Sequence, residues 1–526
     1  MAEVVVIGSG ASGVHFALTL LKKGYDVVML DVGRTRPEAV NPEYSFDGLK
    51  RGLDDPVEYF LGGDFRSVIL PGNKGKYYGL PPSKGYVLAS RGELGVEADG
   101  FSPLASFARG GLAEAWTAGS YPFGDAELAD FPFGYDDIEP YYSTVAERIG
   151  ITGAEDDLSA FLPFHANITG PLRLDAHSSL LLESYQAKKR SFNRKGFYLG
   201  RSRVATLADP MDGRQGCTYC GRCLWGCPTG ALYTPSMTLD ECMDFKNFTY
   251  VPGVRVTHFD YDSGGRATKV FAARLDDGKT LDFKADHVAL AAGALGSSKI
   301  FLDSIWKKTG RIKRLTGLMD NRQVLVPFVN LKMAGRPVES EAYQYNLIAM
   351  GLVGAAAKDY VHMLVTTLTS SLVHPLIESF PFDLRTSTFL FSRLHAALGI
   401  VNVNFPDTRR EGNYVTITPG QGGTGLSLRY APAHDDSARV GRTITRLRRL
   451  LRKLGCVAPS AMTHVRPMGA SVHYAGTLPM TRGGGPLTTD ELCRSVDFPN
   501  LYVVDGATFP FLPAKNCTQT LMANAV

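Results

Sequence analysis

Four cysteines stand close together near the middle of the sequence. They are Cys217, Cys220, Cys223 and Cys227, and Pro228 follows the last of them, which gives the spacing C-x2-C-x2-C-x3-C-P. Thiolates at this density are either metal ligands or a liability to oxidation. The spacing is one that holds iron–sulfur clusters, so we expect this run to bind such a cluster.

Two alternatives stay open for the cysteine run. A structural zinc site is the main competitor, although zinc ligands usually come as two close pairs on separate turns. The cluster type is also open, because in two-cluster ferredoxins the fourth cysteine of such a run serves the other cluster and this chain has no second run. Either all four cysteines hold a [4Fe–4S] cluster, or three of them hold a [3Fe–4S] cluster.

The N-terminal segment is typical of a dinucleotide-binding unit. The apolar run Val4–Ile7 predicts a buried parallel strand, and G-x-G-x-x-G follows it directly, before a helix and a second strand that ends on an acid. Glycines let the backbone approach a pyrophosphate, the helix N-terminus adds partial positive charge, and the acid accepts from ribose hydroxyls. The residues concerned are Gly8, Gly10, Gly13 and Asp31.

Two later segments favour an enclosed FAD over an exchanging NAD. Residues 288–301 predict a strand that runs into a glycine-containing turn and a helix, and residues 501–513 predict a buried strand that ends on an acid and a glycine. Loops far apart in sequence therefore close around one long ligand. The residues at these turns are Ala292, Gly293, Asp505 and Gly506.

With these motifs in view, the chain resembles the glucose–methanol–choline (GMC) oxidoreductases, flavoenzymes that oxidise alcohols. The resemblance covers most of the length and keeps the family's order of motifs. The segments that carry it are VVVIGSGASG at the N-terminus, ARGGLAEAWTAGSYPF at 108–123, YDDIEPYY at 135–142, AAGALGSSKI at 291–300, SVHYAGTLPM at 471–480, VVDGATFP at 503–510 and NCTQTLMANA at 516–525.

The resemblance implies an α/β fold with two domains. A doubly wound, Rossmann-like FAD domain is expected from the non-contiguous segments 1–150, 200–315 and 465–526, with the cysteine loop inside it. A substrate domain built on an antiparallel sheet is expected from 151–199 and 316–464, where alternating stretches are more frequent.

The resemblance also assigns roles to residues near the flavin. Gly110 and Gly111 fall in the loop that passes near the flavin, and Val256 aligns less securely with the adenine contact. The family's acid–glycine pair at 505–506 lies in the ribityl-pyrophosphate region. His473 and Asn516 fall at the paired active-site positions, although the family usually has proline where this chain has Cys517.

The chemistry of this pair suits alcohol oxidation. Hydride transfer from an alcohol carbon is easy only if the hydroxyl proton also leaves, and a neutral imidazole can accept that proton. Asn516 can donate to the developing alkoxide. For a lone histidine a structural role is the commoner explanation, and His464, His374 and His395 lack the supporting motif that His473 has.

Some membrane-linked sugar dehydrogenases of the GMC family carry a similar cysteine loop, ending in a sequence like CPTGALY, and hold a three-iron cluster. By that resemblance Cys217, Cys223 and Cys227 are the firmer ligands, and Cys220 is the doubtful one. A flavin carries two electrons and a cluster passes one at a time. The loop therefore implies a relay to an external acceptor, such as a cytochrome.

The sequence as a whole indicates an FAD-dependent alcohol or sugar dehydrogenase with a small-molecule substrate, to which residues 339–407 are expected to contribute the pocket wall. The alternatives are an oxidase with a structural cysteine loop, a flavin-bearing electron-transfer subunit, and a lyase. The net charge of +4 and the lack of a Lys/Arg block argue against nucleic acid. With no signal peptide or spanning segment visible, we expect a cytoplasmic protein, although export with a partner subunit stays open.

Overall fold

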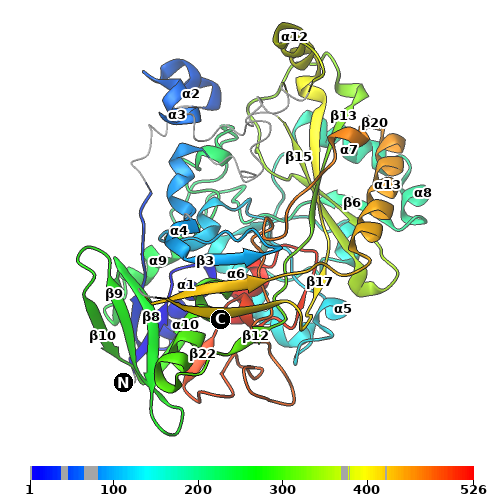
Figure 1. Ribbon diagram of the computed structural model, residues 1–526. Coiled ribbons are helices and arrows are strands. Elements are labelled where there is room, and N and C mark those ends of the chain that lie inside the picture. Colours follow the sequence, from blue (N-terminus) through cyan, green and yellow to red (C-terminus); the bar gives the residue numbers. More distant parts are fainter. Residues whose placement is uncertain are drawn as a thin grey trace.

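The computed structural model describes residues 3–36, 45–63, 81–89, 91–368, 377, 380–420 and 423–526 (Figure 1). The chain is built around two large sheets of different kinds. A parallel sheet lies in the lower part of the view in Figure 1, and an antiparallel sheet that includes β13 and β15 lies in the upper right.

The parallel sheet has five strands, drawn from distant parts of the chain. In spatial order they are β22 (Leu501–Val503), β11 (His287–Leu290), β1 (Glu3–Ile7), β2 (Asp26–Leu30) and β7 (Phe248–Val251), and every neighbouring pair is parallel. The expected doubly wound unit assembled from non-contiguous segments is confirmed.

The apolar run of β1 fills both faces of this sheet. Val4 and Val6 point into one hydrophobic core, while Val5 and Ile7 point into another. Side chains alternate along a strand, so a strand covered on both faces reads as a continuous apolar run instead of an alternating one. This is why Val4–Ile7 lacks polar residues.

Helices cover the two faces unequally. The first core contains side chains of α1 (Ala11–Lys22), α6 (Tyr135–Ile149), α9 (Pro235–Met243) and α14 (Thr518–Ala525). The second contains α10 (Gly293–Thr309) and the antiparallel strands β8 (Val254–Tyr261), β9 (Ala267–Arg274) and β10 (Thr280–Lys284). Helix α14 brings the C-terminal segment against α1, which begins at the glycine loop.

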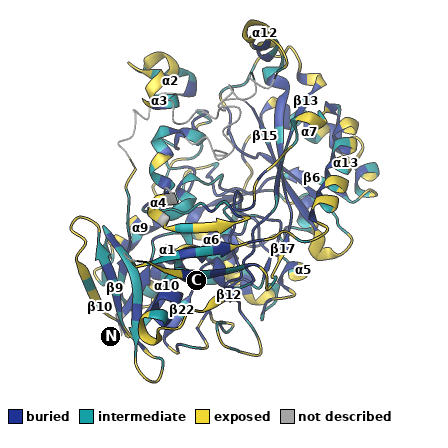
Figure 2. Ribbon diagram, viewed as in Figure 1, coloured by how far each residue is buried: buried dark blue, intermediate teal, exposed yellow. Residues whose placement is uncertain are grey.

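The second large sheet is antiparallel and has seven strands. They are β6 (Phe197–Arg201), β14 (Ile348–Leu352), β15 (Val361–Thr367), β16 (Leu398–Asn404), β13 (Gln323–Asn330), β20 (Cys456–Val457) and β21 (His464–Val465). One face packs on α7 (Ala176–Gln186) and α13 (Asp436–Leu454) through an apolar core. Figure 2 shows this sheet as largely buried.

A smaller sheet joins the two regions. It pairs β12 (Arg314–Thr316), β18 (Tyr414–Gly420), β19 (Gly423–Arg429) and β3 (Val96–Asp99) in that order. Residues 414–429 lie within the segment expected to belong to the substrate domain, yet their apolar side chains enter the core that includes α10. This hairpin therefore packs on the dinucleotide-binding side.

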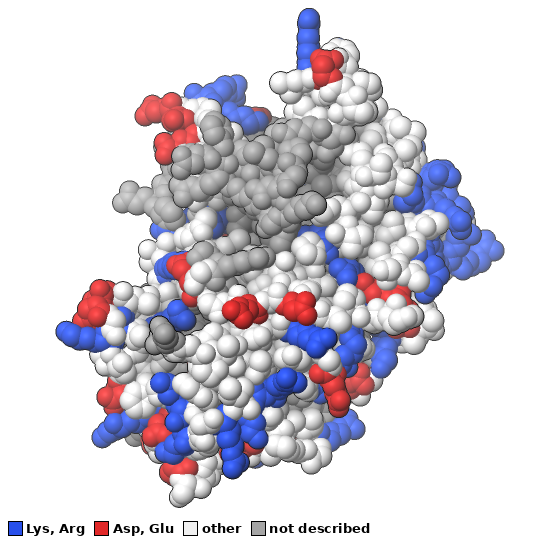
Figure 3. Space-filling view, viewed as in Figure 1, with Lys and Arg blue, Asp and Glu red and all other residues white. Residues whose placement is uncertain are grey.

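Basic side chains gather on one face of the molecule, over α13 and α8 (Lys189–Asn193) (Figure 3). The exposed cations there are Lys188, Arg190, Arg194, Lys195, Arg442, Arg449, Arg452 and Lys453. The amphipathic helix α13 buries its leucines and leaves its arginines in solvent, so separated residues meet on one surface. None of the helices in the described ranges is long and apolar enough to cross a membrane.

Candidate active site

A buried carboxylate holds the turn that carries His473. The Oδ2 of Asp320 accepts from the backbone N–H of Gly469 at 2.6 Å, and its Oδ1 accepts from the hydroxyl of Ser471. That hydroxyl oxygen accepts the backbone N–H of His473 at 3.0 Å. Within the turn Val472 has a φ of 58°, a left-handed conformation that costs an L-residue about 1–2 kcal/mol. Strain of this kind persists where the surroundings fix it and is concentrated at functional sites.

The ring of His473 is enclosed and neutral. Only 8% of the residue is exposed, and burial lowers the pKa of the imidazole to about 4. Its Nδ1 lies 2.8 Å from Oδ1 of Asn321, whereas its Nε2 has no hydrogen-bond partner among the described residues. The ring therefore presents one nitrogen with no protein partner, in a form that can accept a proton at neutral pH.

Asn321 links His473 to the segment that leads to Asn516. Besides facing His473, its Nδ2 donates to the carbonyl oxygens of Phe405 at 2.8 Å and Pro513 at 2.9 Å. Pro513 lies in the segment that leads to Asn516. The sequence analysis missed Asn321, and its only signal there was an acid–amide pair, Asp320–Asn321, just before an apolar strand.

Asn516 lies just before α14, with its side chain unpaired. Its Oδ1 is buried and has no hydrogen-bond partner among the described residues. A Cβ on Gly119 would lie 3.3 Å from its Nδ2, so the loop around Gly119 packs closely against the amide. The neighbouring Lys515 is buried, donates to the Pro122 carbonyl at 2.9 Å and pairs with Glu127. The segment is therefore anchored while the Asn516 amide stays available.

The face of the antiparallel sheet opposite its helices carries polar side chains beside the apolar Ala349 and Leu364. Val401 and Val403 of β16 enter the core formed with α13, so Asn402 and Asn404, which alternate with them, point to the opposite face. Asn402 Oδ1 and Asn404 Nδ2 are buried and lack partners among the described residues. Asn404 Oδ1 accepts from Gln323 at 2.8 Å. Unpaired buried groups of this kind suit a ligand that bears hydroxyls.

The glycine loop has the packing expected of a dinucleotide site. A Cβ on Gly8 would stand 2.7 Å from the Ala291 carbonyl oxygen, and one on Gly13 would stand 2.0 Å from the Gly8 carbonyl oxygen. A Cβ on Gly10, by contrast, would meet no atom within 4 Å. Gly10 is the N-cap of α1, whose first turn has no acid. Two glycines thus allow close packing, and the third borders open space at a helix N-terminus, where a pyrophosphate fits.

Asp31 ends β2 beside this loop. Its Oδ2 accepts from the hydroxyls of Ser9 and Tyr250, the latter at 3.1 Å, and burial raises the pKa of its carboxyl to about 6. Ser9 Oγ also accepts the backbone N–H of Gly110 at 2.9 Å. A Cβ on Gly111 would lie 3.1 Å from Gly10 Cα. The loop with both predicted glycines is therefore seated on the dinucleotide loop.

The remaining predicted cofactor residues lie on neighbouring elements. Asp505 accepts from Ser297 Oγ at 2.5 Å and from the N–H of Ala507 at 3.0 Å, and burial raises the pKa of its carboxyl to about 6. A Cβ on Gly506 would stand 2.4 Å from the carbonyl oxygen of Tyr474, which adjoins His473. The cofactor segment and the histidine turn are therefore in contact.

Ala292 caps the N-terminus of α10, and Gly293 has a φ of 75° with open space around a Cβ. Val256 lies half-buried in β8. This strand begins at Val254, whose N–H donates to the carbonyl of Asp31 at 3.1 Å. Val256 follows two residues later in the same strand, and its role as the adenine contact stays a prediction.

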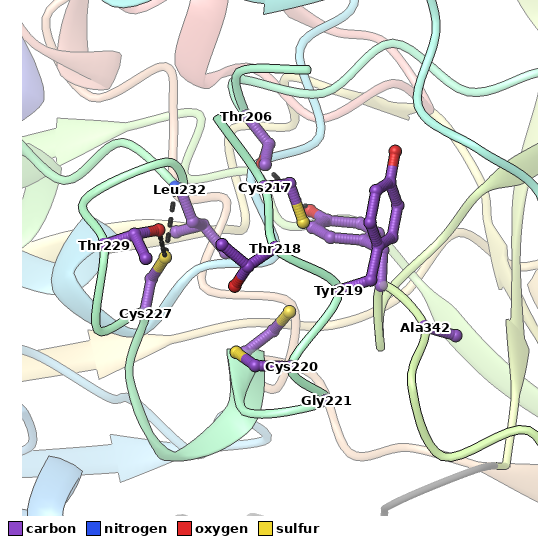
Figure 4. Close-up of a pocket in the computed structure, with 12 residues that line it drawn as sticks. Thr206, Cys217, Thr218, Tyr219, Cys220, Gly221, Cys227, Thr229, Leu232 and Ala342 are labelled. Atoms are coloured by element: carbon purple, nitrogen blue, oxygen red, sulfur yellow. Dashed lines mark hydrogen bonds between the residues drawn. The ribbon is translucent and has the colours of Figure 1, made fainter. Parts of the chain in front are cut away.

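The four cysteines line one pocket (Figure 4). Figure 4 shows Cys217, Cys220 and Cys227 arranged around it on successive turns of one loop. The pocket encloses about 300 Å³ of space not filled by atoms, part of it open to solvent, and Tyr343 and Leu232 complete the wall. Burial raises the pKa of the Cys217 thiol to about 11.

Three of the four thiols have described hydrogen-bond partners, and those of Cys217 and Cys223 are backbone groups of Tyr219 and Gln344. Cys227 Sγ accepts from the Leu232 N–H at 3.5 Å and lies 3.5 Å from the hydroxyl of Thr229. In the described part of the chain no group of three or more His, Cys, Asp or Glu side chains is arranged to hold a metal ion. The structure therefore brings the four cysteines together around one pocket, but their side chains are not arranged to bind a single metal ion.

The other histidines weighed in the sequence do not join this site. His464 is exposed in β21. His395 is half-buried beside Phe391, with ring centroids 4.7 Å apart, which is a packing contact. His374 lies outside the described residues.

Comparisons with known proteins agree with this arrangement. Two sequence models of the GMC oxidoreductase family match residues 184–313 and 411–525. Paromamine 6'-oxidase of Streptomyces fradiae is 23% identical over 100% of this chain and 90% of its own length. The 2-methyl-1,2-propanediol dehydrogenase of Mycolicibacterium austroafricanum is 24% identical over 100% of this chain and 94% of its own length.

A solved structure extends the comparison to the fold. The crystal structure of pyridoxine 4-oxidase from Mesorbium loti superposes with a TM-score of 0.60, at 14% sequence identity, over 100% of this chain and 98% of that one. This likeness supports the two-sheet architecture described above, with a Rossmann-like dinucleotide-binding unit.

Proposed function

We propose that the chain is a member of the GMC oxidoreductase family, whose two sequence models match residues 184–313 and 411–525, and that it is an FAD-dependent enzyme that oxidises a CH–OH group of an alcohol or sugar. The observation that carries the proposal is the buried, neutral His473, whose Nε2 has no partner among the described residues and whose turn contacts the segment around Gly506. FAD, when bound in the cradle of Gly8, Gly10 and Gly13, supplies the acceptor for the hydride.

The protein's own residues move the proton and orient the substrate. In this proposal His473 Nε2 accepts the hydroxyl proton, and the Asn516 amide donates to the oxygen as negative charge develops there. Enclosure excludes water from the reacting oxygen and strengthens both interactions. Segments 1–150, 200–315 and 465–526 form the proposed FAD domain, and 151–199 and 316–464 the proposed substrate domain, except that strands β18 and β19 pack on the FAD side.

The substrate proposed is a polyhydroxylated alcohol or sugar. Asn402 and Asn404 leave buried polar atoms unpaired on the sheet face opposite the helices, and a ligand with several hydroxyls would satisfy them. Two of the similar proteins are named for paromamine and for 2-methyl-1,2-propanediol, and the second compound carries two hydroxyls.

We propose that the cysteine run holds an iron–sulfur cluster, which would supply one-electron transfer to an external acceptor. A single tetrahedral zinc holds its sulfurs about 3.8 Å apart, given Zn–S bonds of about 2.3 Å. A cluster binds each thiolate to a different iron and therefore spreads the thiolates more widely. The spacing C-x2-C-x2-C-x3-C-P and the position of all four cysteines around one pocket support the cluster over zinc.

The test is anaerobic mixing of the purified holoenzyme with a panel of alcohols and sugars. Flavin absorbance is followed together with cluster absorbance and iron content. Bleaching of the flavin by at least one polyol or sugar is expected. Failure of every CH–OH donor to bleach the flavin would contradict the proposed reaction and favour an electron-transfer subunit.

A second candidate is an oxygen-using oxidase with a structural cysteine loop. Two of the similar proteins are named oxidases, which favours it. Adding oxygen to the reduced enzyme separates the candidates. Slow reoxidation with little peroxide, in iron-loaded protein that reduces a one-electron acceptor, supports the dehydrogenase, whereas rapid stoichiometric peroxide formation without iron supports the oxidase.

A further inference from the structure

We propose that Asn321 is a positioning residue that fixes which nitrogen of His473 carries the proton and where the ring points. This inference rests on the proposed function, in which His473 is the base. It adds a residue that no sequence motif indicated, and it makes Nε2 the nitrogen that reacts.

The orientation of the Asn321 amide follows from its partners. The carbonyl oxygens of Phe405 and Pro513 only accept hydrogen bonds, so the group that faces both of them, at 2.8 and 2.9 Å, is the NH₂. Both amide hydrogens are then used. A flipped amide would set its oxygen against two carbonyl oxygens in a buried site, which is strongly unfavourable. Oδ1 therefore faces His473.

The protonation form of His473 follows from that orientation. Oδ1 of Asn321 can only accept, and it lies 2.8 Å from Nδ1 of the imidazole, so Nδ1 carries the hydrogen. A neutral imidazole has one N–H, which leaves the lone pair on Nε2. Nε2 has no partner among the described residues, and burial keeps the ring neutral.

The same contacts fix where the ring stands. Asn321 joins the end of β16, through Phe405, to the segment that leads to Asn516, through Pro513. Its neighbour Asp320 holds the backbone of the histidine turn through Ser471. Two consecutive residues thus set the backbone and the ring of His473, and they couple its position to that of Asn516.

During oxidation the proton balance is simple. The hydroxyl O–H bond breaks, an N–H bond forms at Nε2, and the imidazole becomes an imidazolium that still donates from Nδ1 to Asn321. The charged and titratable groups packed around this turn are Asp320, Arg322, Asp407 and Cys517. Burial raises the pKa of Asp320 to about 7, so its titration is measured separately with Asp320→Asn.

Asn500 offers a matched control. It is fully buried, its Nδ2 donates to the carbonyls of Ala267 at 2.8 Å and Asp286 at 2.7 Å, and its Oδ1 accepts from the N–H of Ala267. Its bonding pattern equals that of Asn321, except that its oxygen faces backbone instead of an imidazole. Asn500→Ala should therefore reproduce the loss of stability of Asn321→Ala without the loss of function.

The experiment compares Asn321→Ala, Asn321→Asp and Asn500→Ala in the full holoenzyme. Asn321→Ala should lower kcat roughly 10- to 100-fold, as loss of groups that orient a histidine does, with a smaller change in KM. Asn321→Asp keeps an acceptor for Nδ1–H but sets its second oxygen against the carbonyls of Phe405 and Pro513, so it should also lower stability. The negative charge of its carboxylate raises the pKa of the imidazole. Its acid limb of kcat/KM should therefore move to higher pH than in the wild type.

A readout independent of turnover is the ¹⁵N spectrum of the His473 ring, assigned by comparison with His473→Gln. The wild type and Asn321→Asp should show a protonated Nδ1 and an unprotonated Nε2. Asn321→Ala should instead show a mixture of the two neutral tautomers of the ring. If Asn321→Ala keeps the wild-type ring spectrum and loses no more rate than Asn500→Ala, the inference is wrong. If no CH–OH donor is oxidised, the proposed function fails, while the ring spectrum still decides the role of Asn321.

Discussion

The histidine turn and the cysteine loop hold their reactive groups in different ways. In the histidine turn, hydrogen bonds from Asp320, Asn321 and Ser471 hold the backbone and the ring of His473, while no hydrogen bond from the described residues reaches its Nε2. In the cysteine loop the four thiols share a pocket, and three of them have hydrogen-bond partners: backbone groups for Cys217 and Cys223, and the Leu232 N–H with the Thr229 hydroxyl for Cys227.

This difference indicates two ways of building a site. A proton acceptor works only if one nitrogen is bare and correctly aimed, so the protein must arrange it in advance. A metal cluster supplies its own geometry and most of the binding energy, so the loop needs only to bring thiols together. We therefore expect substitutions in the histidine turn to change the rate of substrate oxidation, and substitutions in the cysteine loop to change the metal content.

Removing the base should have the largest effect. His473→Gln keeps a polar side chain of similar size but no group that can accept the proton at neutral pH, so kcat for substrate oxidation should fall roughly 10²- to 10⁴-fold. Rapid-mixing measurement of flavin reduction checks this. His464→Gln, an exposed histidine in β21, serves as the control and should leave the rate unchanged. Equal rates in His473→Gln and the wild type would show that His473 is not the base.

Single cysteine replacements should separate iron binding from the reduction of the flavin by substrate. Cys223→Ser should lose most of the iron and the transfer of electrons to an external acceptor, while reduction of the flavin by substrate continues near its wild-type rate. Iron analysis and stopped-flow absorbance measure the two effects. Cys242→Ser, which removes a buried cysteine outside the run, should change neither.

The same series sharpens the ligand assignment. If the cluster has three irons, Cys220→Ser should keep its iron, whereas a four-iron cluster should be damaged by all four replacements. Zinc in the purified protein, with no iron after anaerobic reconstitution, would contradict the cluster.

The pH dependence should reflect how deeply the imidazole is buried. Burial lowers the pKa of His473 from 6.5 to about 4, and only the neutral form accepts a proton. The kcat/KM of flavin reduction should therefore show no histidine limb near pH 6.5 and should fall as the pH drops through about 4. A limb at pH 6.5 that disappears in His473→Gln would mean that the ring is solvated in the working enzyme.

Relief of the strained backbone at Val472 should have the smallest of the expected effects, and it should appear in the stability of the protein. Glycine adopts a positive φ freely, so Val472→Gly should raise the free energy of unfolding by about 1 kcal/mol, or leave it unchanged where chain entropy offsets the gain. Denaturant unfolding measures this change. Because the turn becomes more mobile, kcat should fall although the protein is no less stable, and a rise in kcat would show that the strain is unnecessary.

Motifs with local physical causes were predictable from the sequence. The glycine loop, the strand Val4–Ile7 and the acid Asp31 act through backbone geometry within one short segment, so their spacing is visible directly. The antiparallel sheet was also expected from alternating residues, as in β13. The packing of residues 414–429 on α10 was not expected, because a strand's pattern shows which face is buried but not against which partner.

The basic surface over α8 and α13 also could not be predicted from the sequence. Its cations are spread over two segments in which apolar residues intervene, so no Lys/Arg block stood out. Folding placed them side by side when the apolar face of α13 was buried.

The sequence by itself determined the family's motifs, the types of chemistry available and the spacing of the four cysteines, because these depend on residues close together in the chain. Only the tertiary structure decided that Asp320 and Asn321 hold a histidine more than 150 residues later. A hydrogen bond between distant segments has no local pattern, since it exists only where several elements pack around one point.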